Sequence, residues 1–320
     1  MIHWDDGLFL TRPRLALDVR RRQGAGFVSH AHADHIAPHE LAYATPATGR
    51  IYQHRLGPRR RVVELPYRTP REFGEVRLTT HPAGHCLGSA MLLIESEAGS
   101  ALYTGDYKLG PSATAEQAEL PRADLLVMEC TFGQPRYVMP PREEVVERLL
   151  EIVRNALADG STPVIHAYPL GKSQEATRLL TAERIPVLQH PQIFAISEIY
   201  RACGVDLGDV RPYAKEHLAG AAVVTLPKNS GSYRLPGIKD IVSIALTGWA
   251  VDPGTQHRWK VTHALPLSDH ADYLELLQTA ERVQPREILC THGPADFAGR
   301  LQAAGFNARH VTQAFQTRMF

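Results

Sequence analysis

The chain has 320 residues, of which 44% are hydrophobic, and its 35 basic and 34 acidic side chains leave a formal charge of +1. This length allows one large domain or two smaller ones, and the charge argues against a generally cationic protein. The four cysteines form no CxxC pair, which argues against a disulfide framework and a cysteine zinc site. No segment approaches the ~18 apolar residues of a membrane helix, and no signal sequence opens the chain. We therefore expect a cytoplasmic protein without a membrane partner.

Short apolar segments separated by turn residues predict β-strands up to residue 129. A sandwich of two sheets is the natural way to bury so many strands. Residues 46–56, with Pro46 at the start and Gly57 after the end, predict a helix that lies on this sandwich. The predicted strands are residues 8–10, 15–18, 27–29, 62–65, 76–80, 91–95, 101–104 and 125–129.

From residue 142 the pattern changes to helices that alternate with strands. This alternation predicts a small parallel sheet inserted into the sandwich. We therefore predict an α/β protein whose sandwich domain comprises residues 1–134 and 240–320, and whose inserted domain comprises residues 135–239. The predicted helices are 142–158, 171–182, 193–203, 271–282 and 297–304, and the predicted strands are 164–167, 187–189, 222–226, 241–246, 288–291 and 308–311.

Four side chains that can bind metal fall between residues 30 and 35, directly after an apolar segment. Alternate residues of a strand point to one side, so His30 and His32 are predicted to hold one ion. As the chain leaves the strand, Asp34 and His35 can reach a second ion. Imidazole and carboxylate groups suit zinc, manganese or iron better than calcium.

Three further positions at the ends of predicted strands are candidate ligands. His85 lies in a glycine-punctuated loop, Asp106 in Tyr-Thr-Gly-Asp-Tyr, and His292 in Cys-Thr-His-Gly. Strand ends that open into loops are where a rigid scaffold places reactive groups. Each residue alone is more typical of a capping aspartate or a loop histidine. Together with the histidine cluster, they supply enough nitrogen and oxygen ligands for two metal ions.

The order of these residues, HxHxDH followed by His85, Asp106 and His292, resembles the metallo-β-lactamase fold hydrolases. More narrowly, Pro82–Ser89 and Ser268–Tyr273 look like the β-CASP nucleases, which include mRNA 3′-end cleavage factors, ribonuclease J and Artemis. The resemblance implies an αββα sandwich with a small inserted α/β β-CASP cap.

Within that branch, three segments look most like the bacterial DNA-ligase-associated exonucleases. They are Tyr168–Gln174, Thr247–Trp249 and Leu267–Asp272. This resemblance implies an exonuclease that degrades single-stranded DNA, in a repair set with a DNA ligase and a helicase. We expect attack from the 3′ end, which no residue of the sequence indicates by itself. An RNA-processing nuclease on the same scaffold is the alternative. A lactonase or thioesterase is a more distant one.

The family resemblance also implies a role for each motif residue. His270 matches the histidine that protonates the leaving oxygen, and Glu129 matches the acidic residue that orients it. Asp18 matches an early aspartate that supports the ligand loop without touching metal. Asp34, His270 and Glu129 are therefore the residues expected to carry catalysis. Two ions, Zn²⁺ or Mn²⁺, are implied, one held by His30, His32, His85 and Asp106 and the other by Asp34, His35, Asp106 and His292.

Several groups are candidates for substrate phosphates. A glycine and a lysine open the predicted helix at residue 171, where N–H groups point outward. A polar loop at residues 228–232 is a second candidate, with an ordinary solvated turn as the alternative. Arginines also cluster, and for each cluster phosphate binding and a solvated face are equally supported. The first cluster is Arg12, Arg14, Arg20, Arg21 and Arg22, and the second is Arg55, Arg59, Arg60 and Arg61. The specific candidates are Gly171, Lys172, Ser173 and Ser230.

Overall fold

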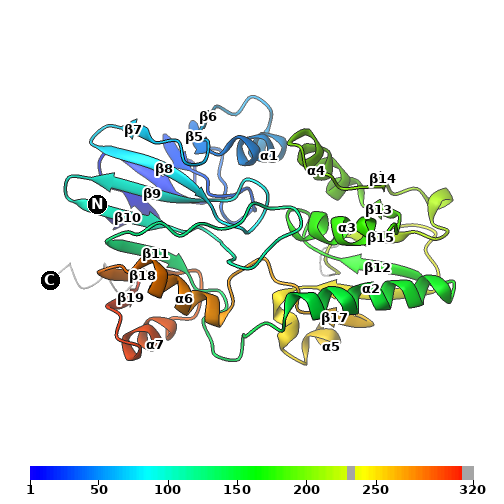
Figure 1. The fold of residues 1–320 in the computed structure, drawn as a ribbon. Helices are drawn as coiled ribbons and strands as arrows, with labels where there is room; N and C mark the ends of the chain where they lie inside the picture. The colour runs from blue at the N-terminus through cyan, green and yellow to red at the C-terminus, as the bar shows by residue number, and fades with distance from the viewer. Residues whose placement is uncertain (229–234, 312–320) are drawn as a thin grey trace. The chain divides into compact units, whose positions relative to one another are not determined.

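The computed structural model describes residues 1–228 and 235–311 (Figure 1). Contacts between residues divide the chain into two compact units. The first unit comprises Met1–Tyr137 together with His270–Phe320, and the second comprises Val138–Asp269.

Within residues 1–137 and 270–311, two sheets and three helices build the first unit. One sheet has the strand order β1-β2-β3-β4-β5-β6, and the other has the order β19-β18-β11-β10-β9-β8-β7. The first sheet comprises β1 (Ile2–Trp4), β2 (Leu8–Leu10), β3 (Leu15–Leu17), β4 (Ala25–Phe27), β5 (Leu41–Ala44) and β6 (Val62–Glu64). The second comprises β7 (Arg71–Phe73), β8 (Val76–Pro82), β9 (Ala90–Ser96), β10 (Gly99–Tyr103), β11 (Leu125–Glu129), β18 (Glu287–Thr291) and β19 (Ala308–His310).

The alternation of side chains along the strands explains why these sheets form layers. On β10, Ala101 and Tyr103 enter the core between the two sheets, whereas Leu102 faces the opposite side. There it joins residues of α6 (Tyr273–Val283) and α7 (Phe297–Ala303) in a second core. Tyr52 of α1 (Pro46–Leu56) packs on the outer face of the first sheet. The layers therefore follow the order helix, sheet, sheet, helix (Figure 1), and the expected αββα sandwich is confirmed.

Capping residues fix the helix ends that the sequence predicts. Thr45 accepts a hydrogen bond from the Thr48 N–H at the start of α1, and Pro46 follows at the first helical position. Asp272 and Glu275 form a reciprocal capping box at the start of α6. Among residues 1–228 and 235–311, no helix combines the length and the hydropathy that crossing a bilayer requires.

The second unit is built around a parallel six-stranded sheet with the order β14-β13-β15-β12-β16-β17. The sheet comprises β12 (Thr162–His166), β13 (Val187–Gln189), β14 (Val210–Pro212), β15 (Ala222–Thr225), β16 (Ile241–Leu246) and β17 (His263–Leu265). The helices are α2 (Arg142–Ala158), α3 (Lys172–Ala182), α4 (Pro191–Ala202), α5 (Thr255–Trp259) and the short turns η1 (Lys215–His217) and η2 (Gly248–Val251).

The second unit ends later than the sequence-based boundary at residue 239. Strand β16 pairs with β12 along its length, and β17 pairs with β16, so both belong to the parallel sheet of this unit. The unit therefore extends to Asp269. Sequence analysis did not predict β1, β5, β7, β14, β17 or α5. Each has only three to five residues, too few for a hydrophobic period to emerge.

Candidate metal centre

The histidine motif lies in a loop and not in a strand. Strand β4 ends at Phe27, and the chain then turns, with the His35 N–H donating to the His32 carbonyl at 3.1 Å. The prediction that strand alternation aligns His30 with His32 is therefore wrong. The turn nevertheless brings their rings together, with centroids 4.8 Å apart.

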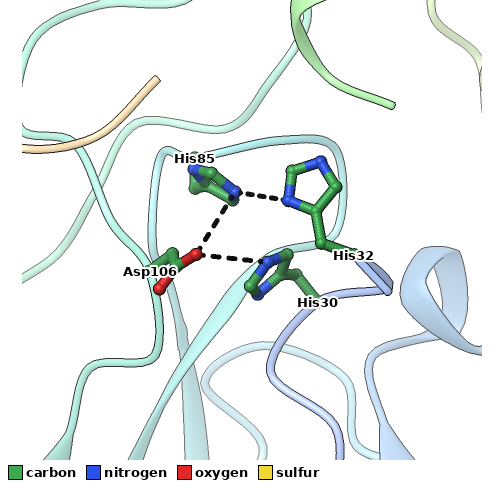
Figure 2. A group of neighbouring side chains, drawn as sticks. All are labelled: His30, His32, His85 and Asp106. Carbon is green, nitrogen blue, oxygen red and sulfur yellow. Dashed lines mark hydrogen bonds and ion pairs between the residues drawn. The ribbon is translucent and has the colours of Figure 1, made fainter. Parts of the chain in front are cut away.

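The first ligand group joins this loop to two others (Figure 2). One nitrogen or oxygen atom from each of its four residues lies within 4.8 Å of the others. His30 Nε2 and His85 Nε2 lie 3.5 and 3.9 Å from Asp106 Oδ2. His32 Nδ1 is 2.9 Å from His85 Nε2. These are His30, His32, His85 and Asp106, the residues predicted to hold the first ion.

The second ligand group shares Asp106 with the first. His35 Nε2 lies 3.2 Å from Asp106 Oδ2, and His292, at the end of β18, completes a cluster of three. Asp34 lies at the edge of this group. Its side chain is 67% exposed, and its Oδ2 is 4.0 Å from His35 Nε2. The geometry thus brings together three of the four residues predicted for the second ion and leaves Asp34 within reach.

Asp18 holds the ligand loop in place through four hydrogen bonds. Its carboxylate accepts the backbone N–H of Ser29 at 2.8 Å and the Ser29 hydroxyl at 2.5 Å. It also accepts the Tyr103 hydroxyl at 2.9 Å and lies 3.0 Å from His35 Nδ1. Because Nδ1 of His35 faces Asp18, its Nε2 is the nitrogen that faces Asp106. Asp18 occupies the supporting position that the family resemblance implies.

The protonation of His30 fits a metal ligand. The Ser29 hydroxyl donates its hydrogen to Asp18, so its oxygen accepts from His30 Nδ1 at 3.0 Å. The lone pair of His30 then lies on Nε2, which is buried and has no hydrogen-bond partner. Burial holds the pKa of His30 well below its usual value, and the neighbouring His35 and His85 lower it further. A buried neutral imidazole with an unused lone pair is the form that binds a metal ion.

The charges of Asp106 and His35 also fit a cation site. Burial alone raises the pKa of Asp106, but His35 and His270 outweigh it and hold this pKa well below its usual value. Burial alone lowers the pKa of His35, but the carboxylates of Asp106 and Asp18 raise it well above its usual value. Asp106 is therefore ionised, and its negative charge attracts cations to the ligand atoms. The residues present fit divalent ions such as zinc or manganese.

A histidine and a glutamate flank the shared ligand. His270 Nδ1 lies 2.9 Å from Glu129 Oε1, and His270 Nε2 lies 4.0 Å from Asp106 Oδ2. Glu129 is buried at the end of β11 and accepts the N–H groups of Tyr107 and Thr131 at 3.1 and 3.2 Å. The imidazole is thus oriented by a fixed carboxylate, with its other nitrogen toward the metal ligands.

Sequence reasoning missed the structural role of Tyr107. Its N–H donates to Glu129, its carbonyl accepts the Ala271 N–H at 2.6 Å, and its hydroxyl donates to Thr279 Oγ1 on α6 at 2.8 Å. One residue after Asp106 therefore connects the shared ligand with the segment that carries His270. The preceding Gly105 is required as well, because a Cβ there would lie 2.5 Å from the Ser29 hydroxyl oxygen and φ is +54°. The only sequence signal is the Tyr-Thr-Gly-Asp-Tyr motif itself.

The predicted phosphate groups at the start of α3 have internal partners. Lys172 is buried, and its Nζ forms an ion pair of 2.8 Å with Asp269 Oδ1. The Ser173 hydroxyl donates to the Tyr168 carbonyl at 2.6 Å, and the Gly171 N–H donates to Gln174. These contacts favour a structural role for all three candidates. Ser230 lies outside the described residues.

One arginine of the first cluster lies with the second cluster in the first unit. Arg22, Arg59, Arg60 and Arg61 line one depression together with His39 and Glu40. Arg22 forms an ion pair of 3.3 Å with Glu40, and Arg60 donates to the Leu56 and Pro38 carbonyls. The structure thus places Arg22 beside the second cluster, and both interpretations of the arginines, phosphate binding and a solvated face, stay open.

Comparison with known families decides the assignment of the fold. Residues 8–190 match the model of the family described as "Beta-lactamase superfamily domain". The chain belongs to the beta-lactamase superfamily. Residues 258–311 also match the model described as "Zn-dependent metallo-hydrolase RNA specificity domain". The predicted metallo-β-lactamase fold is thereby confirmed, and the description of the second matched model is that of a metal-dependent hydrolase, the class of enzyme that the sequence predicts.

Two curated relatives from the superfamily cover most of the chain. A "Probable DNA ligase" from Opitutus terrae is 38% identical over 96% of this chain and 30% of its own length. The "5′ exonuclease Apollo" from Gallus gallus is 28% identical over 85% of this chain and 59% of its own length. The chain therefore spans less than two thirds of either relative. The resemblance to the β-CASP branch and to its ligase-associated members is confirmed.

A solved structure has the same fold. The "Crystal Structure of a Protein of Unknown Function from Enterococcus faecalis V583" matches with a TM-score of 0.58 over 84% of this chain and 75% of that chain. At 16% identity, this likeness shows the fold of the superfamily alone.

Proposed function

We propose that this protein is a two-metal phosphodiesterase that removes nucleotides from the 3′ end of single-stranded DNA, in a repair set with a DNA ligase and a helicase. The observation that carries the proposal is the His270–Glu129 pair, in which the second imidazole nitrogen, His270 Nε2, lies 4.0 Å from the shared ligand Asp106. A phosphodiester requires both a cation site and a proton donor beside it, and this geometry provides both.

Two groups of residues serve the two halves of the reaction, the attack on phosphorus and the departure of the sugar oxygen. Divalent ions held by the two ligand groups would act as Lewis acids that activate water and offset the negative charge of the phosphate. Glu129 lies 2.9 Å from His270 Nδ1 and orients the ring so that Nε2 faces the metal ligands, where the imidazolium form of His270 presents a proton. The oxygen that leaves a nucleotide sugar is strongly basic and gains from such a proton. A thiolate from a thioester does not need one, so the pair argues against the thioesterase alternative.

The choice of DNA rests on the relatives. One is named a probable DNA ligase and the other a 5′ exonuclease. The ligase relative supports a place beside a DNA ligase. The proposed 3′ polarity rests on the resemblance to ligase-associated exonucleases, whereas the name of the Apollo relative states the opposite polarity, so polarity is the first quantity to measure.

An RNA-processing nuclease is the second candidate. It is favoured by the match of residues 258–311 to a family model described as an RNA specificity domain. This segment includes His270 and His292, which are the proposed proton donor and a ligand of the second ion. Both residues have the same roles whether the substrate is DNA or RNA.

The test is product mapping on matched single strands of DNA and RNA, labelled at either end, with Mn²⁺ and Zn²⁺ supplied separately. The proposal expects a ladder of shortened DNA that begins at the 3′ end. Asp34→Ala should lose it, whereas Asp5→Ala, which removes an exposed carboxylate that is no ligand candidate, should keep it. Internal cuts in RNA alone would favour the second candidate. Turnover of a lactone or thioester with both strands intact would refute both.

A further inference from the structure

A cavity of about 440 Å³ in the first unit borders the second ligand group. Asp34 and His292 lie in its lining, together with residues of β1, β2, β3 and β19. Its volume falls in the range of cavities that hold small organic ligands, about 300–1,000 Å³. A substrate phosphate placed on the metal ligands therefore has a neighbouring space large enough for a nucleoside.

One wall of the cavity is a row of apolar side chains across three strands. Trp4 pairs with Leu8, and Leu8 pairs with Leu17, so the three side chains stand side by side on one face of the sheet. Leu8 and Leu17 belong to the core between the two sheets, whereas Trp4, at the end of β1, is 38% exposed. An indole at the mouth of an apolar wall is a surface on which a base can stack.

The apolar wall of the cavity continues into the core of the first unit. Ile2 and Leu10, two positions before Trp4 and two positions after Leu8, pair with each other and are packed in the core between the sheets. The wall is therefore anchored by packed residues on its inner side.

Positive charge lies at the rim. Arg20 and Arg21 both line the cavity. Arg21 is committed to Asp6, with Nη1 2.6 Å from Oδ2. Arg20 is exposed and forms no ion pair within residues 1–228 and 235–311. Its guanidinium is therefore available to a phosphate group at the mouth of the cavity.

We propose that this cavity binds the terminal nucleoside of the substrate strand, with its base stacked on Trp4 and a phosphate beside Arg20. The proposal rests on the proposed function, because it requires a nucleic-acid substrate whose scissile phosphate lies on the metal ligands. It deepens that function by naming the part of the substrate that the apolar wall of Trp4, Leu8 and Leu17 contacts.

The experiment compares Trp4→Ala and Trp4→Phe with wild type on three substrates. The first is a single strand with a normal terminal nucleotide, the second has an abasic residue at the end that wild type attacks, and the third is bis(p-nitrophenyl) phosphate. Leu274→Ala, which removes an exposed apolar side chain on α6, is the matched control. Loss of base stacking is expected to raise KM for the normal strand about 10-fold in Trp4→Ala. Trp4→Phe should retain most of the affinity.

The three substrates separate the ways in which the proposal can fail. It expects Trp4→Ala to stop distinguishing the normal strand from the abasic one and to hydrolyse bis(p-nitrophenyl) phosphate like wild type. An unchanged preference in Trp4→Ala would overturn the cavity assignment while leaving the proposed function standing. An equal loss on all three substrates would show a structural role for Trp4 and would also overturn it. If wild type hydrolyses only bis(p-nitrophenyl) phosphate, the proposed function itself fails.

Discussion

Buried polar residues gather in two places, the ligand loops of the first unit and the start of α3 in the second, but their bonding differs. In the ligand loops, His30 Nε2 is buried without a hydrogen-bond partner, and three imidazoles turn toward one carboxylate. At the start of α3, the Ser173 hydroxyl is bonded to a carbonyl, and the buried Lys172 Nζ, which also has no hydrogen-bond partner, forms an ion pair of 2.8 Å with Asp269. Buried polar groups normally find partners. The unused lone pair of a neutral imidazole therefore points to an external cation, whereas an ammonium group that already faces a carboxylate points to a structural role.

The strongest test of this contrast is Asp106→Asn. Asp106 is the only residue common to the two groups of metal ligands among those described. Its loss should reduce activity by more than the about 10- to 100-fold that is typical of residues that only orient ligands. Metal content measured by atomic emission should fall in parallel. Full metal content with full activity in Asp106→Asn would remove it from both groups.

His270→Ala should separate proton transfer from metal binding. A general acid typically contributes about 10²- to 10⁴-fold, so kcat should fall by that factor while metal content stays at the wild-type level. The alkaline limb of the pH–rate profile should disappear with it. Loss of metal in this variant would instead make His270 a ligand.

Lys172→Met tests the other side of the comparison. Removing one member of a buried ion pair leaves the Asp269 carboxylate uncompensated, which typically costs about 3–5 kcal/mol of unfolding free energy. Urea denaturation measures this cost, and Lys172→Met combined with Asp269→Leu should recover much of it. If Lys172 instead receives a substrate phosphate, stability will hold and the salt dependence of DNA binding will flatten.

Tyr103→Phe is expected to have the smallest effect. It removes one of the four hydrogen bonds to Asp18 without changing shape, because the Tyr103 hydroxyl donates to Asp18 Oδ2. The buried carboxylate loses one donor, and we expect metal affinity to fall by about 10-fold, the lower end for residues that orient ligands. Competition with a chelator measures the change. Leu102→Val, on the opposite face of the same strand, should leave metal affinity unchanged.

The hydrophobic pattern of the sequence predicted those helices and strands that are long enough for the spacing of their apolar residues to be recognised. Helices α1 and α2 and strand β16 lie where their hydrophobic spacing and end signals place them. The end of the second unit was missed because it depends on the pairing of β16 with β12, a contact between residues far apart in the chain. Hydrophobic spacing along one segment does not encode which strand it pairs with.

In the candidate site too, some residues could be predicted from the sequence and others could not. His30, His85 and Asp106 were identified because metal-binding side chains are chemically distinctive and recur at strand ends. Tyr103 and Tyr107 were missed because a tyrosine in an apolar strand looks like any other core residue. Trp4 gave no signal either, since its importance arises only from its place in a row across three strands. Residues that act by position become visible only in three dimensions.

The parallel pairing of β11 with β18 has a consequence for how this chain can change over time. Glu129 and Thr291 are partners in register, and His292 follows Thr291 directly. The carboxylate that orients the proton donor and a ligand of the second ion are thus set by one shared alignment. Insertion or deletion of a single residue in either strand would turn one of them to the opposite face of the sheet. Substitutions in these strands can be absorbed one at a time, but changes in their length cannot, so we expect homologous chains to vary in loop length elsewhere and to keep these two strands uninterrupted.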